Sequence, residues 1–426
     1  MASRDIRPKQ SKTTNPTLPP ELITEILSRL PVKSLLKFRS VSKSWLSLIS
    51  TPQFINTHLI LSTSNNNKDY THHMLTLNIT APTYSLYEYS LQDITLKSLF
   101  YESVTEPLDL DYPMQSNGLY KKLHNYLWIV GSVNGLICLA IEKYDLVLWN
   151  PSIRKYKKLP DSRPTLMKAD CCPLYGFGYD EFHDDYKVVG VFLKYGGDQV
   201  EVKIYSLQSD SWKSVDDRPT RHLLNISGKF VNGKLYWVTC RDIFNMYKDW
   251  NIISIDLADE KWGKVEQPSY GEGYFELKLG VFGSDLSVLC DNLVTHVDVW
   301  VMKEYGVKES WTKMFTIKYP DDPFVDYDYL FFPPSFISSK GEILVYFGSS
   351  KYMTCSTSHD RKSYFMTYNP KDDSFRFSEV TNIDGWRWAE IYVESLVCPL
   401  STEGTKNVTK TKAGKAQIMT TEQQIT

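Results

Sequence analysis

The stretch LPPELITEILSRLPVKSLLKFRSVSKSWLSLISTPQF, from Leu18 to Phe54, says more about this 426-residue chain than any other segment. Pro19 and Pro20 can open a helix, because the first helical positions need no donated N–H. Apolar residues then recur at steps of three and four as far as Leu30, which is the helical period. Pro31 follows, and its ring clashes with the preceding turn. The pattern predicts a first short helix that ends before Pro31.

Two more short helices are predicted after this break. Val32–Phe38 reads as a second helical turn, and Ser42 is a good N-cap for a third helix that carries Trp45. The three helices together span about 40 residues, a size at which contacts with other protein surfaces usually complete a fold. The stretch therefore predicts a docking module.

The order of these residues closely resembles an F-box. A generic helical cap on a larger domain is the alternative, but such a cap requires only the helical period and not this order of proline, leucine and tryptophan. The signature elements stand here as Leu18-Pro19, Ile26-Leu27, Leu30-Pro31, Leu35-Leu36, Arg39-Ser40-Val41-Ser42-Lys43 and Trp45.

The resemblance implies a Skp-type adaptor as partner, with a cullin and a RING subunit of a ubiquitin ligase joined through that adaptor. Nearby basic residues (Lys33, Lys37, Arg39 and Lys43) could face an acidic adaptor surface or form an ordinary solvated face, and the sequence leaves both readings open. By the same resemblance, ten residues would share an apolar core with the adaptor: Leu18, Pro19, Ile23, Leu27, Leu30, Pro31, Val32, Leu35, Leu36 and Val41.

The composition is that of a folded protein without a strong charge preference. Hydrophobic residues make up 42% and aromatic residues 14%, which indicates a large core and favours β structure. A net charge of −2 and the lack of a basic stripe argue against a nucleic-acid partner. The seven cysteines form no CxxC pair and no regular disulfide spacing, which suits a reducing compartment.

We expect four regions along the chain. Residues 1–16 and 401–426 have few apolar anchors and are expected to be disordered. The F-box is assigned to 17–60 and a β domain to 72–400, with a polar break between them. The sequence shows no secretion signal and no apolar run long enough to cross a bilayer, so we expect a cytoplasmic and/or nuclear protein with no membrane partner.

From about residue 72 the apolar period changes to that of strands, and no convincing helical period follows. Turn residues separate the candidate strands, which indicates short antiparallel strands. The clearest are Val133–Leu139, Lys187–Leu193, Val200–Leu207, Gly233–Val238, Val297–Met302 and Gly341–Phe347.

These strands belong to a recurring unit that closes with a strand, a polar turn and an aromatic residue. Successive closing aromatics are 56, 50, 49 and 64 residues apart by subtraction, near the roughly 50 residues of a kelch-type blade. We count six units and predict a mostly β protein: a three-helix F-box followed by a β-propeller-like domain of about six blades. The closing aromatics are Tyr156, Trp212, Trp262, Trp311 and Phe375.

Radial packing would bury both faces of each sheet, with a closing aromatic in the wedge between neighbouring blades. The final strand Ala389–Leu400 could pair with the first unit and close the ring. A seven-bladed ring and a twisted β-sandwich are the alternatives. The region also resembles the F-box-associated domain of plant F-box proteins, a group with kelch-like and S-locus members, through segments such as NGLICL, LWNPSIRKYKKLP and IISIDLADEKW. In that family the domain recruits the protein to be ubiquitinated.

Residues that could carry chemistry have simpler explanations. His183 and its acidic neighbours lack convergent metal-ligand spacing, so we interpret their segment as a hairpin turn with solubilising acids. Cys171-Cys172 is better explained by packing than by redox chemistry, and His72-His73 has no third ligand nearby in the sequence. No phosphate loop, nucleophile elbow or HExxH motif is present. We therefore expect no catalytic residue, no metal and no cofactor.

Two loops rich in aromatic, Asp and Arg residues, Arg241–Trp250 and Lys318–Phe332, contain the residue types that anchor protein contacts. Each ring taken singly is better explained by packing between blades, but as groups in irregular segments they predict a target-binding face, whose acids would suit a basic partner. Its residues are Arg241, Phe244, Tyr247, Trp250, Asp321, Asp322, Asp326, Tyr327 and Asp328.

The sequence thus predicts a non-catalytic substrate receptor of an SCF-type (Skp–cullin–F-box) ubiquitin ligase, whose β domain holds a protein target for degradation. An immune regulatory role is one reading. Recognition of a secreted ribonuclease by a pollen S-locus protein is the second. The alternative from another class is a propeller enzyme or ligand-binding protein in which the F-box-like segment is incidental.

Overall fold

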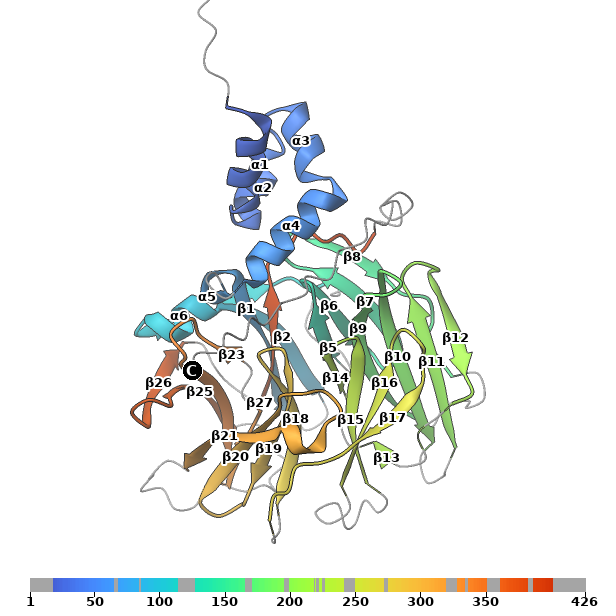
Figure 1. Cartoon of the computed structure of the whole chain (residues 1–426), viewed down its shortest axis with the longest axis vertical. Coiled ribbons are helices and arrows are strands. Elements are labelled where there is room, and N and C mark those ends of the chain that lie inside the picture. The colour runs from blue at the N-terminus through green and yellow to red at the C-terminus, as the bar shows by residue number, and fades with distance from the viewer. Residues whose placement is uncertain are drawn as a thin grey trace, which may run out of the picture.

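The computed structural model describes residues 18–400, apart from 65–67, 84–85, 114–126, 165–170, 195–198, 218, 220–221, 224–226, 241–249, 272–274, 319–327, 334–335, 351–360 and 382–385. A small helical lobe stands at one end of a large β domain (Figure 1). The lobe consists of α1 (Pro20–Ser28), α2 (Val32–Phe38), α3 (Lys43–Ile49) and α4 (Pro52–Thr63).

The first three helices begin where the sequence predicts. Pro20 stands in the first turn of α1, and α2 has the predicted bounds. Ser42 caps α3, because its Oγ accepts a hydrogen bond from the Trp45 backbone N–H at 3.1 Å. The fourth helix was not predicted, because its apolar residues do not form one clear stripe. His58 of α4 forms a 2.9 Å hydrogen bond with the Leu30 carbonyl and so ties α4 to the turn between α1 and α2.

The first sheet closes the β domain. Its order is β27-β1-β2-β4, and β27 pairs antiparallel with β1 from Val393↔His72 to Trp386↔Ile79. This pairing confirms that the last strand joins the first unit. It also corrects the strand's extent, because pairing stops at Val393 and the chain then leaves the sheet. The strands are β1 (His72–Thr83), β2 (Leu86–Thr95), β4 (Leu108–Leu110) and β27 (Trp386–Val393).

Two further sheets are four-stranded antiparallel meanders. One contains β5 (Leu127–Val133), β6 (Leu136–Ile141), β7 (Asp145–Asn150) and β8 (Lys155–Lys158). The other contains β18 (Glu276–Phe282), β19 (Asp285–Asp291), β20 (His296–Met302) and β21 (Trp311–Lys318), with the 3-10 helix η2 (Lys308–Ser310) between its last two strands.

The largest sheet has nine strands and joins two meanders through a short parallel pairing of β9 with β14. The first meander contains β9 (Cys171–Asp180), β10 (Asp185–Lys194), β11 (Val200–Ser206) and β12 (Ser211–Val215). The second contains β14 (Ser227–Val231), β15 (Lys234–Cys240), β16 (Asn251–Asp256) and β17 (Trp262–Val265), and the short β13 (His222–Leu223) pairs with β15.

The fifth sheet has six strands, and two short helices accompany it. Its strands are β22 (Asp328–Phe331), β23 (Phe336–Ile337), β24 (Ile343–Ser350), β25 (Arg361–Asn369), β26 (Ser374–Val380) and β3 (Val104–Thr105). The helices are α5 (Lys68–Thr71) and α6 (Leu96–Tyr101).

Three details of the sequence prediction need correction. The strands of the described residues form five sheets and not six separate blades, because β14 hydrogen-bonds to β9 and merges two units. The predicted strand Val133–Leu139 is broken by a turn, since Asn134 and Gly135 both have positive φ. Helix α6 is too short to produce a readable helical period.

Candidate adaptor-docking and target-binding surfaces

The F-box helices expose a group of large apolar side chains that do not belong to the lobe's core cluster. Leu22 and Ile26 lie four residues apart on one face of α1, and each is 50% exposed. Several exposed large apolar side chains on one small lobe often indicate a site of protein contact. We call the exposed group the docking surface; its residues are Leu18, Leu22, Ile26, Val41 and Leu46.

The ten residues predicted to contact an adaptor fall into two sets. Leu27, Val32 and Leu35 are at most 2% exposed and form the core of the helical lobe itself. The remaining seven are partly buried or exposed. Among them, Leu18 and Val41 belong to the docking surface. The other five are Pro19 and Pro31, which are exposed, and Ile23, Leu30 and Leu36, which pack partly against the lobe's core.

The predicted set therefore does not include the exposed residues Leu22, Ile26 and Leu46. The signal that could have found them is that α1 is apolar on more than one side, with Ile23 and Leu27 packed against the lobe's own core and Leu22 and Ile26 turned to solvent. A helix that is apolar all round is expected to be covered on both sides. The second cover is absent from the described part of this chain.

The described residues around the predicted target face give a mixed result. Trp250 is half-buried and packs against a core cluster that includes Val238 and Ile252, so its ring serves packing within the β domain. Asp328 is the first residue of β22. The other predicted residues lie outside the described residues: Arg241, Phe244, Tyr247, Asp321, Asp322, Asp326 and Tyr327.

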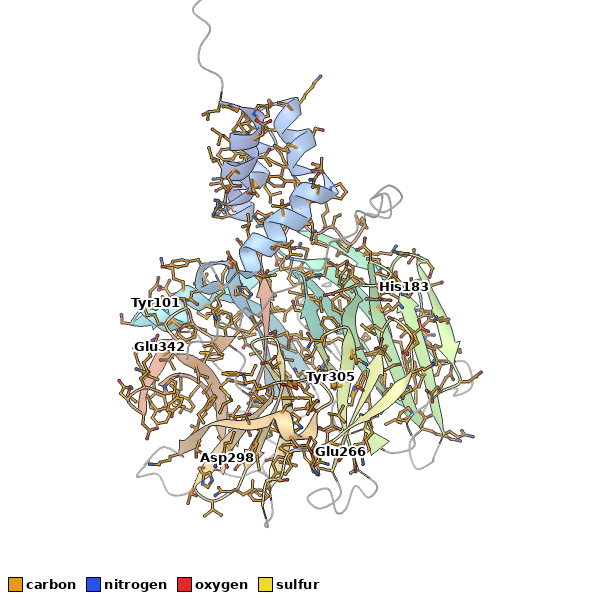
Figure 2. All side chains as sticks on the ribbon, in the orientation of Figure 1. Tyr101, His183, Glu266, Asp298, Tyr305 and Glu342 are labelled. Carbon is orange, nitrogen blue, oxygen red and sulfur yellow. The ribbon has the colours of Figure 1, made fainter. Side chains whose placement is uncertain are left out.

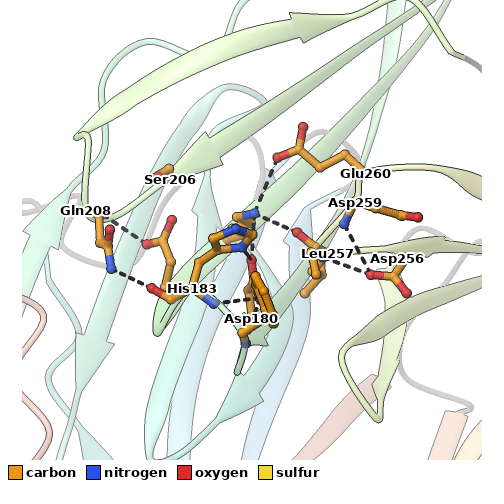
Figure 3. Close-up of polar contacts among 12 residues, drawn as sticks. Asp180, His183, Ser206, Gln208, Asp256, Leu257, Asp259 and Glu260 are labelled. Carbon is orange, nitrogen blue, oxygen red and sulfur yellow. Dashed lines mark hydrogen bonds and ion pairs between the residues drawn. The ribbon is translucent and has the colours of Figure 1, made fainter. Parts of the chain in front are cut away.

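The segment with His183 and several acids is a hairpin turn between β9 and β10, as predicted. Its acids are not merely solubilising, however, because Asp180 is only 1% exposed. The Asp180 carboxylate accepts hydrogen bonds from Lys187 Nζ at 2.9 Å and from the backbone N–H of Phe182 at 3.0 Å, and it lies 2.7 Å from His183 Nδ1 (Figure 3). These contacts make the turn a structural ion-pair site.

This ion pair also joins the two meanders of the nine-stranded sheet. Lys187 Nζ donates to the Leu257 carbonyl at 2.6 Å and lies 3.3 Å from Glu260, both in the turn between β16 and β17 (Figure 3). Burial alone would raise the pKa of Asp180, but the bonds from Lys187 and His183 lower it overall. Burial would likewise lower the pKa of Lys187, and its acidic partners raise it.

A cavity of about 490 Å³ opens beside this network. Its lining includes His183, Lys213 and Glu260, and Lys213 Nζ lies 2.6 Å from the Glu260 carboxylate. The cations of the cavity are thus paired with acids of the same chain. Across the described ranges, no group of three or more His, Cys, Asp or Glu side chains is arranged to hold a metal ion.

The other two candidate pairs are also part of the packing. Cys171 is buried, and its Sγ lies 3.2 Å from the Tyr144 hydroxyl, while Cys172 stands next in the same strand. Successive strand residues point to opposite faces, so the two thiols diverge. His73 is held against the Asp93 carboxylate at 3.0 Å, and burial lowers the pKa of His72 to about 4.

Together, the folded β domain and the helical lobe with its exposed apolar face define a two-part docking protein. The match to known families agrees with that class. The F-box domain family matches residues 16–57, and the family described as F-box associated beta propeller domain matches residues 102–398. In the part of the chain that the structure describes, no helix is both long and apolar enough to cross a membrane.

Whole-chain relatives give the same result. The chain is 32% identical to an F-box/kelch-repeat protein of Arabidopsis thaliana, over 90% of this chain and 96% of that protein. It is 33% identical to the F-box protein CPR1 of the same plant, over 71% of this chain and 74% of the relative. The chain belongs to the F-box proteins that carry an F-box-associated β-propeller domain.

Among solved structures, the chain is similar to TolB from Acinetobacter baumannii, with a TM-score of 0.43 and 10% identity over 80% of this chain and 73% of that chain. A similarity at this level carries no inference about activity.

Proposed function

We propose that the chain is a substrate receptor of an SCF-type ubiquitin ligase, and that it binds a Skp-type adaptor through the docking surface. The observation that carries this proposal is the set of uncovered apolar side chains of the F-box, where Leu22, Ile26 and Val41 are half-exposed or more although the lobe has a packed core of its own. Full burial of such a side chain from an exposed state is worth about 1.5–3 kcal/mol, so each of these half-exposed side chains would contribute roughly half of that on binding.

The core residues of the lobe then have an indirect role. Leu27, Val32 and Leu35 hold α1 and α2 together and so fix the spacing of the docking side chains. The exposed lysines Lys33 and Lys37 lie on α2 of the same lobe and would meet an acidic adaptor surface. The receptor itself supplies no chemistry: ubiquitin transfer is accelerated because a bound target lysine is held near the loaded conjugating enzyme.

Charge substitution on the docking surface tests this proposal. Leu22→Asp combined with Ile26→Asp should weaken binding to a purified Skp-type adaptor at least about 100-fold, because two carboxylates would be buried in an apolar interface. Val294→Asp is the matched control, since Val294 is 74% exposed but lies on the β domain. Equal adaptor affinity of the wild type and the double variant would refute the assignment.

We further propose that the target binds through the loops that connect strands at the end of the β domain away from the F-box. Figure 2 places Glu266 and Asp298 at that end and His183 nearer the helical lobe. The segment 241–249 connects β15 to β16. It does so at one end of this strand pair, and the Lys234↔Asp256 pair lies at the other end. A target face there would leave the F-box free for the adaptor.

Proximity labelling in plant tissue under proteasome inhibition would identify the target. Capture of an immune receptor would assign an immune regulatory role, whereas pollen-restricted capture of a secreted ribonuclease would assign a self-incompatibility role. Asp321→Lys with Asp322→Lys should weaken capture of a basic target, because it reverses two charges in the predicted face. Unchanged capture by this variant would exclude those aspartates from the target-binding face.

A further inference from the structure

The five residues after the closing strand, Glu394–Cys398, cross the junction between the helical lobe and the β domain. We call this segment the strap. Its residues read as a continuation of β27, but they pair with no strand in the described sheets. Instead, alternate residues of the strap contact the two parts of the protein, which is how an extended segment presents its side chains.

One face of the strap completes the F-box. Leu396 is 1% exposed and belongs to the same core cluster as Val32 and Ile49. Two residues earlier, the Glu394 carboxylate faces the open N-terminus of α2, where the Val32 backbone N–H lowers its pKa against the larger, opposite effect of burial. The F-box core therefore includes a residue that lies more than 300 positions further along the chain.

The other face of the strap is held by the β domain. Asn150, at the end of β7, is fully buried, and its Nδ2 donates to the Ser395 carbonyl at 3.0 Å and to the Val397 carbonyl at 2.8 Å. The Val397 side chain packs against the core cluster between the β5–β8 and β9–β12 sheets. Gly135 leaves the space for this contact, because a Cβ there would lie 2.3 Å from Ser395 Oγ.

We propose that the strap is a clamp that completes the F-box core and fixes the orientation of the F-box on the β domain. Because F-box and strap share one core, the small helical lobe gains stability that its own residues do not supply. The last step of the inference rests on the proposed function: a fixed orientation sets the distance between a bound target and the catalytic end of the ligase, so Leu396 and Asn150 are positioning residues.

The chain contains an internal reference for Asn150. Asn369 ends β25 as Asn150 ends β7, and both are followed by proline. Each side-chain Oδ1 accepts the backbone N–H two residues later, from Lys371 and Ser152 respectively. Asn150 makes the contacts with the strap in addition to this turn. Comparing the two positions therefore separates the strap contact from the turn that both residues cap.

Hydrogen–deuterium exchange on the full-length chain tests the shared core. Leu396→Ala should lower the protection of the α1 and α2 amides at least about tenfold, because a cavity opens in their core, while the β18–β21 sheet keeps its protection. Leu396→Met should retain protection, since it conserves volume. Leu400→Ala is the control, because Leu400 is 52% exposed. Unchanged protection of α1 and α2 in Leu396→Ala would overturn the clamp, as would an equal loss throughout the β18–β21 sheet.

Distance measurement tests the orientation. Spin labels carried by noncanonical amino acids at Lys43 on α3 and Lys308 on η2, both exposed, should give a narrow distance distribution in the wild type. Asn150→Ala should widen it at least about twofold, and Asn369→Ala should not. Equal widths for all three chains would overturn the positioning role. Neither experiment contains an adaptor, so a failure of the ligase assignment would appear separately, in the adaptor titration.

Discussion

The indole N–H of Trp311 donates a hydrogen bond to the backbone carbonyl of Glu266 at 2.8 Å, and so joins the start of β21 to the chain just beyond β17. The same contact recurs along the domain. Trp262 Nε1 lies 3.2 Å from the Asp217 carbonyl, beyond β12. Trp212 Nε1 lies 2.9 Å from the Pro160 carbonyl, beyond β8. Three of the five closing aromatics thus bind the preceding unit, as predicted, whereas the prediction was wrong for Tyr156 and Phe375, which are exposed.

Trp311→Phe should therefore weaken the packing between units. The substitution keeps an aromatic ring but removes the N–H and leaves the Glu266 carbonyl without that donor. We expect a loss of about 1–2 kcal/mol in the free energy of unfolding, measured by urea denaturation. Tyr156→Phe at the equivalent position is the control, since Tyr156 is 47% exposed; its effect should stay within about 0.5 kcal/mol. Equal effects of the two substitutions would contradict the role of the indole.

Lys187→Met should lower the free energy of unfolding much more than the sequence around Lys187 suggests. Removal of this cation leaves the Asp180 carboxylate buried without its main partner, which typically costs about 3–5 kcal/mol. The double variant Asp180→Asn with Lys187→Met should recover part of the loss, because no uncompensated charge remains. Both are measured by thermal and urea unfolding.

Lys213→Met provides the contrast for Lys187. Lys213 pairs with the same Glu260, but its side chain is 60% exposed, and exposed ion pairs contribute little to stability. We expect a change of at most about 0.5 kcal/mol. If Lys213→Met cost as much as Lys187→Met, the ion-pair site would not owe its strength to burial.

The N-cap of α3 offers a test within the F-box. Ser42→Ala removes the side-chain acceptor of the Trp45 N–H and should cost about 1 kcal/mol of stability. It should lower adaptor affinity only as far as the lobe unfolds, since Ser42 is not on the docking surface. Ser47→Ala, at an exposed position of the same helix, should be neutral. A loss of adaptor binding in a fully folded Ser42→Ala chain would instead place Ser42 in the interface.

The parts of the fold that local rules determine could be predicted from the sequence. Proline and an N-cap serine mark the ends of α1, α2 and α3, and the period-two pattern marks the strands and the closing partner of β1. The strap could not be predicted, because Leu396 continues the strand period and its partners lie hundreds of residues away. Asp180 was misjudged for a different reason: Lys187 is close in the sequence, but a turn acid appears solvated until the β9–β10 hairpin places that lysine against it.

The candidate adaptor-docking site could likewise be predicted only in part from the sequence. The F-box was recognisable, but the pattern did not separate residues of its own core, such as Leu27, from residues that are exposed, such as Ile26. Both are apolar and adjacent, and only the packing of α1 against its neighbours distinguishes them.

Two neighbouring histidines of β1 should respond to pH in opposite directions. Burial lowers the pKa of His72 to about 4, so the folded state keeps it neutral while the unfolded chain protonates near pH 6.5. His72 therefore costs stability as pH falls from about 6.5 to about 4, by at most about 1.4 kcal/mol per pH unit. Burial also lowers the pKa of His73, but the hydrogen bond and charge of Asp93 and the charge of Glu394 raise it overall.

The contribution of His73 is fully present below about pH 6.5 and is lost as the pH rises through its raised folded-state pKa. His73→Gln should therefore cost more stability at pH 5.5 than at pH 8.5, whereas His72→Gln should reduce the decline that the wild type shows from pH 7 to pH 5. Free energies of unfolding from urea titrations at three pH values measure both effects. If the two variants had parallel pH profiles, the opposite protonation states of His72 and His73 in the folded protein would be wrong, and Asp93 would not be the counter-ion that keeps His73 charged.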